Sequence, residues 1–105
     1  MSLSLNREGP DGLIEWSESI ASTKFFNRCW DPAISALHIK LFQENSGFAL
    51  AEVQEVLSEL EQIKDWAKTH LDEKDAETLV EKATHLQEAI PTAFIDHEKS
   101  TIYIY

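Results

Sequence analysis

The side chains best suited to chemistry in this chain of 105 residues are four histidines and a single cysteine. The histidines are His38, His70, His85 and His97. They show neither the HxxxH nor the ExxH spacing that brings metal ligands together on one turn of a helix. Cys29 has no second cysteine with which to form a disulfide or a zinc knuckle. We therefore predict no metal and no cofactor, and a buried Cys29 in a reducing compartment.

Catalytic motifs are absent from the sequence. It contains no GxSxG nucleophile elbow, no glycine-rich phosphate loop and no HExxH. Cys29 stands near the end of a predicted short helix, where a thiolate is poorly stabilised. Carboxylates are plentiful, but we expect them on exposed helix faces, where desolvation cannot raise a pKa toward neutrality. The sequence predicts a protein that is not an enzyme.

Charge is the most distinctive property of the chain. Nineteen acids stand against nine bases, which gives a formal net charge of −10. Residues 49 to 90 hold eleven of the acids and four of the bases. Binding to phosphate requires Lys and Arg to displace counterions, so nucleic acid and anionic membranes are poor partners. A basic protein is the favoured partner.

Length and composition indicate a single acidic domain over residues 1–105. We find neither a secretion signal nor an apolar run long enough to span a membrane, so the predicted location is cytoplasmic. Residues 1–12 are polar and end in a Gly-Pro-Asp-Gly turn, which predicts a flexible leader.

Short elements follow the leader. Apolar residues alternate with polar ones from Leu13 to Ile20, which predicts a half-buried strand with Glu18 as the exception. Ser22 is a candidate N-cap for one short helix. Asp31 as N-cap and Pro32 at the first helical position indicate the start of a second short helix, which we expect to end near residues 45–47.

Two long amphipathic helices are the clearest structural signal. Apolar residues recur at helical spacing from about Phe48 to Leu71 and again from Ala76 to Ile90, where Pro91 is expected to end the helix. The polar connection between them is short, so the helices should form an antiparallel hairpin.

The C-terminal segment returns to a period of two. Phe94-Ile95 and residues 101–105 flank a polar turn, which predicts a terminal β-hairpin whose last strand lies beside the strand from Leu13 to Ile20. The predicted fold class is α+β: an antiparallel helical hairpin and two short helices pack on a small antiparallel sheet built from the N- and C-terminal strands.

The acids of the helical hairpin provide the candidate binding face. On a helical wheel, Glu52, Glu55 and Glu59 lie opposite the apolar stripe, and Trp66 shares their bearing. An aromatic side chain with acidic surroundings is typical of an interface hot spot. The second helix adds Glu77 and Glu81. The competing interpretation is a solvated acidic face that keeps the protein soluble, with Trp66 covered by a neighbouring loop.

Size, acidity and predicted layout resemble the immunity proteins of bacterial toxin systems, including colicin and contact-dependent inhibition systems. The resemblance extends over the whole chain and rests on no motif. It implies a protein that neutralises a cognate toxin, often a basic nuclease, by blocking its substrate groove with carboxylates in place of phosphates. No site residue is transferred by the resemblance.

Two other functions are compatible with the same sequence. One is a DNA mimic of the anti-restriction type, although four lysines interrupt the acidic hairpin: Lys64, Lys68, Lys74 and Lys82. The other is a homo-oligomeric regulatory module that pairs through the apolar stripe or through the strand from Ile102 to Tyr105. We expect a monomer or a weak homodimer.

Overall fold

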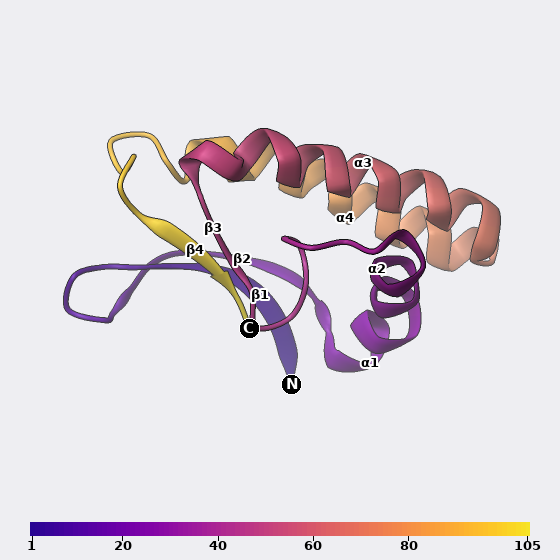
Figure 1. Ribbon diagram of the computed structural model, residues 1–105. Helices are drawn as coiled ribbons and strands as arrows, with labels where there is room; N and C mark the ends of the chain where they lie inside the picture. Colours follow the sequence, from indigo (N-terminus) through magenta and orange to yellow (C-terminus); the bar gives the residue numbers. More distant parts are fainter.

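The computed structural model describes residues 1–105 and has two layers, a sheet and a pair of long helices that cover one of its faces (Figure 1). The sheet has four antiparallel strands in the order β2-β1-β4-β3. The strands are β1 (Ser2–Glu8), β2 (Ile14–Ser22), β3 (Gly47–Ala49) and β4 (Thr101–Ile104). The α+β class is confirmed, with the helical hairpin packed on a sheet that both ends of the chain help to build.

The N-terminal residues form an inner strand of the sheet. β1 pairs with β2 along one edge and with β4 along the other. Leu3 and Leu5 are buried in the core, and the flexible leader predicted for residues 1–12 is therefore wrong for Ser2–Glu8. The turn predicted at residues 9–12 is present, and it joins β1 to β2.

The C-terminal strand is also internal. β4 lies between β1 and β3, so the predicted pairing of the last strand with β2 is wrong. Residues 93–96 form turns, so the predicted terminal hairpin is wrong. The strand beside β4 is instead β3, which the sequence did not indicate. Because both edges of β4 are occupied, self-association through this strand is ruled out as a route to an oligomer.

The short helices follow β2 without a break. α1 (Thr23–Phe25) begins where the hydroxyl of Ser22 accepts a hydrogen bond from the Phe25 N–H at 3.2 Å, as the sequence predicted. The π-helix η1 (Phe26–Trp30) then runs directly into α2 (Asp31–Leu37), so Asp31 is not a cap. α2 ends earlier than expected, because His38 adopts a left-handed backbone with φ 55°.

The predicted helical hairpin is present as α3 (Val53–His70) and α4 (Glu73–Thr92), and a turn of 3₁₀-helix, η2 (Leu50–Glu52), precedes it. The carboxylate of Asp72 accepts a hydrogen bond from the Asp75 N–H at 2.8 Å and caps α4. Pro91 lies inside the last turn of α4 instead of ending it. Phe48 belongs to β3, which explains why α3 begins later than the sequence predicted.

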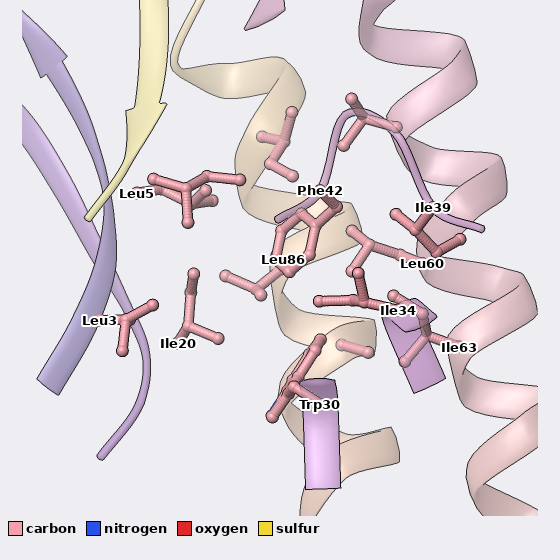
Figure 2. Close-up of a cluster of buried hydrophobic side chains, with 14 of the residues drawn as sticks. Leu3, Leu5, Ile20, Trp30, Ile34, Ile39, Phe42, Leu60, Ile63 and Leu86 are labelled. Atoms are coloured by element: carbon pink, nitrogen blue, oxygen red, sulfur yellow. The ribbon is translucent and has the colours of Figure 1, made fainter. Parts of the chain in front are cut away.

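The core lies between the sheet and the helices. Figure 2 shows Leu3, Leu5 and Ile20 on the sheet side, facing Leu60 and Ile63 of α3 across the interior. At about 25 cal/mol per Å² of apolar surface removed from water, this cluster supplies the main stabilising contribution to folding. α4 is thereby fixed alongside β2, which determines the surface described next.

Candidate functional site

Glu59 belongs to the interior and not to the binding face predicted for it. Its side chain is buried, and its two carboxylate oxygens accept hydrogen bonds from the backbone N–H groups of three residues in the segment that follows α2. The donors are Lys40 at 3.0 Å, Leu41 at 3.2 Å and Phe42 at 2.8 Å. The segment covers this part of α3, so Glu59 is a structural residue, and its assignment to a partner surface is wrong.

The other predicted residues of α3 and its N-terminal end are not gathered in one place either. Glu52 is half-buried and accepts a hydrogen bond from the Ala49 N–H at 3.0 Å, at the start of the helical segment. Glu55 is exposed. Trp66 is half-buried and lies eleven residues further on, or about 16 Å along the helix axis. The predicted cluster of acids around an aromatic side chain is therefore not assembled.

Trp66 has neighbours of its own. Its ring packs partly against the core and stacks on the imidazole of His70, with centroids 4.5 Å apart and planes within 6°. The backbone carbonyl of Trp66 lies 2.9 Å from Nδ1 of the same histidine. Trp66 is thus held within its own chain, but its stacking partner is a histidine of the same helix and not the neighbouring loop of the alternative interpretation.

Glu77 and Glu81 do belong to one exposed acidic surface. They continue a series at helical spacing along the outside of α4, which we call the acidic α4 face and define as Glu73, Glu77, Glu81 and Glu88. None of these four carboxylates forms an ion pair or a hydrogen bond within the chain. Lys74 and Lys82 stand on the same helix, but neither forms an ion pair with these acids.

Two acids of α3 differ from those of the acidic α4 face, because they are paired with lysines. Glu61 lies 3.2 Å from the ammonium of Lys64, and Asp65 lies 4.0 Å from that of Lys68. A hydrogen bond from Gln87 and the pairing with Lys64 hold the pKa of Glu61 below its ordinary value. Both lysines of α3 are thus paired with acids of their own helix, whereas Lys74 and Lys82 of α4 form no ion pair, so the unpaired carboxylates of the hairpin lie mostly on α4.

A cleft of about 470 Å³ adjoins the acidic α4 face, between α4, β2 and α1. Ile20, Ala21 and Phe25 provide its apolar lining. Its polar lining comes from α4: Thr78, Glu81, Lys82 and His85. The cleft combines an apolar floor with a carboxylate that has no partner, which suits a long cationic side chain.

Two contacts between α4 and β2 fix the wall of the cleft. The imidazole of His85 bonds through Nε2 to the carboxylate of Glu18, and the ammonium of Lys82 donates to the hydroxyl of Ser19 at 3.5 Å. No hydroxyl or thiol is bonded to His85, so the nucleophile and base arrangement of covalent catalysis is not assembled there. The sequence signalled this contact, because Glu18 was the acid that broke the alternation of its strand.

Cys29 is fully buried and unpaired. Burial raises the pKa of its thiol above the ordinary value, which lowers the fraction of reactive thiolate at neutral pH. We expect native protein to react with iodoacetamide about a hundredfold more slowly than urea-unfolded protein, as measured by mass spectrometry. Equal rates in the two states would contradict a closed site.

Comparisons with known proteins supply no further guide. No protein-family model, curated protein or solved structure matches the chain. Within the structure, no three His, Cys, Asp or Glu side chains are grouped so as to hold a metal ion. No helix combines the length and the apolar character needed to cross a bilayer.

Proposed function

We propose that the protein is a non-catalytic binding protein that attaches to a basic partner through the acidic α4 face. The observation that carries the proposal is the presence of four exposed glutamates on one side of α4, none of them in an ion pair within the chain. Such a surface attracts a positively charged protein and speeds the encounter. The partner class that we favour is a cognate toxin domain. Such a domain would have a basic groove for nucleic acid, and these carboxylates would block that groove.

Charge reversal on α4 tests this proposal. We expect the variant E77K/E81K/E88K to bind the basic partner, which is to be sought first as the product of a neighbouring gene, about thirtyfold more weakly than the parent protein does, a loss of about 2 kcal/mol. Titration calorimetry at low and physiological ionic strength would measure it, and added salt should weaken the parent complex much more than that of the variant.

A matched control removes the same charge elsewhere. Glu44, Glu55 and Glu98 are exposed and form no ion pair, and their reversal to lysine changes the net charge by the same amount. The control variant should retain binding within about threefold. Equal weakening by both variants would mean that overall charge matters and the α4 face does not. Absence of weakening in either would reject ionic binding altogether.

A further inference from the structure

The outer edge of β2 is the one long strand edge that the fold leaves open. β2 is nine residues long and stands at the end of the sheet, with β1 on its inner side only. Among the features that commonly protect such edges, β2 lacks lysine and proline and has two register shifts and two acids, Glu15 and Glu18. The register shifts lie on either side of the stretch from Trp16 to Ser19, whose pairing with β1 is regular.

The backbone at the middle of this edge points outward. Ser4 and Tyr105 exchange both backbone hydrogen bonds, at 2.8 and 3.1 Å. Because bonding direction alternates along a strand, Leu5 directs its backbone groups toward β2, where its partner is Glu18. The next residue of β2, Ser17, therefore directs its N–H and C=O toward solvent. An added strand would find a free donor and a free acceptor there.

The surroundings of the edge select a cationic occupant. A strand laid beside β2 would turn alternate side chains toward α4, where Glu81 lines the cleft. Lys82 and His85 already bond to β2, whereas Glu81 has no partner. A lysine or arginine could lay its aliphatic stem on Phe25 and place its charge beside Glu81.

A second copy of the chain fits this edge poorly. It would bring a protein with the same net charge of −10 to the same place and set one acidic α4 face near another. Like charges brought together at an interface oppose association. Charge complementarity favours a basic segment from a different protein.

We propose that β2 receives an extended basic segment of the partner as a fifth strand of the sheet, with its cationic side chains turned toward Glu81 and the acidic α4 face. This inference rests on the proposed function, because it names the part of the basic partner that the acidic face recruits. Main-chain hydrogen bonds to β2 provide the affinity, and the cleft beside Phe25 provides the specificity.

The experiment uses the full chain and a synthetic peptide as long as β2 that alternates lysine and valine. Ser17→Pro removes the outward N–H, which an edge position tolerates. It also removes the hydrogen bond from the Ser17 hydroxyl to Asn6, which measures 2.9 Å. Ser17→Ala loses only that bond and is the matched control. We expect Ser17→Pro to weaken peptide binding about tenfold relative to Ser17→Ala.

A second measurement does not depend on the proline variant folding. In the parent protein, saturating peptide should slow hydrogen exchange of the Ser17 amide at least about tenfold, because the N–H becomes bonded. An unchanged exchange rate overturns the strand addition, as does equal binding by the two Ser17 variants.

The outcomes separate this inference from the proposed function. Weaker peptide binding by E77K/E81K/E88K, together with equal binding by the Ser17 variants, would reject the added strand and leave the acidic face in place. If neither the α4 variant nor Ser17→Pro bound the peptide more weakly than its control, both the acidic face and the added strand would be rejected. A third outcome is a protein that is dimeric by light scattering without peptide and whose Ser17 amide is already protected. That result would identify the occupant of the edge as a second copy and overturn the basic segment.

Discussion

Deletion of residues 2–8 is expected to abolish folding of the domain. These residues form β1, which supplies the inner strand between β2 and β4 and buries Leu3 and Leu5. Without β1 the sheet is divided, and the core loses side chains whose truncation alone costs about 2–5 kcal/mol each. Because whole domains are stable by only about 5–15 kcal/mol, the shortened chain should lose its cooperative unfolding transition in circular dichroism.

Point variants give the graded control for this deletion. Leu5→Ala should lower the free energy of unfolding by about 3 kcal/mol, whereas Leu13→Ser, at a side chain that is 67% exposed, should change it by less than about 0.5 kcal/mol. A shortened chain that still unfolded cooperatively would show that β1 is dispensable, as the prediction of a flexible leader implied.

The long helices were predictable because their information is local. Apolar residues at a spacing of three and four determine both the existence of α3 and α4 and the side that each buries. A short connection then dictates the antiparallel hairpin. Only the ends were displaced, and at α3 the cause is a strand that takes Phe48.

The strands depended on information that is not local. β1 does alternate Leu3 and Leu5 with polar residues, but so short a pattern beside a Gly-Pro turn is equally typical of a loose terminus. Its partner β4 lies at the opposite end of the chain. Pairing across such a separation leaves no mark within either segment, so the order of the sheet could not be deduced.

The sequence predicted that the candidate site is acidic, but it did not predict which of the acids are exposed. A helical wheel identifies which residues face away from the hairpin, and it placed Glu77 and Glu81 correctly on the exposed side of α4. It does not show what else covers a helix. Glu59 has the wheel position of a surface acid, yet the segment after α2 folds over it.

Replacement of Glu59 by alanine is expected to destabilise the protein by about 3–5 kcal/mol. A buried carboxylate is costly unless hydrogen bonds offset its loss of hydration, and here three backbone N–H groups do so. Hydrogen bonds to a charged group contribute about 1.5–3 kcal/mol each, and alanine would leave the buried N–H of Phe42 without an acceptor. Urea denaturation measures the loss.

Two further variants distinguish the hydrogen bonds from the space that the side chain fills. Glu59→Gln keeps the shape, but its NH₂ group would face N–H donors in place of an acceptor, so we expect about 2–3 kcal/mol of destabilisation. Glu55→Ala, at an exposed position of the same helix, should cost less than about 0.5 kcal/mol. Glutamine as stable as glutamate at position 59 would mean that volume, and not the acceptor oxygens, holds the segment onto α3.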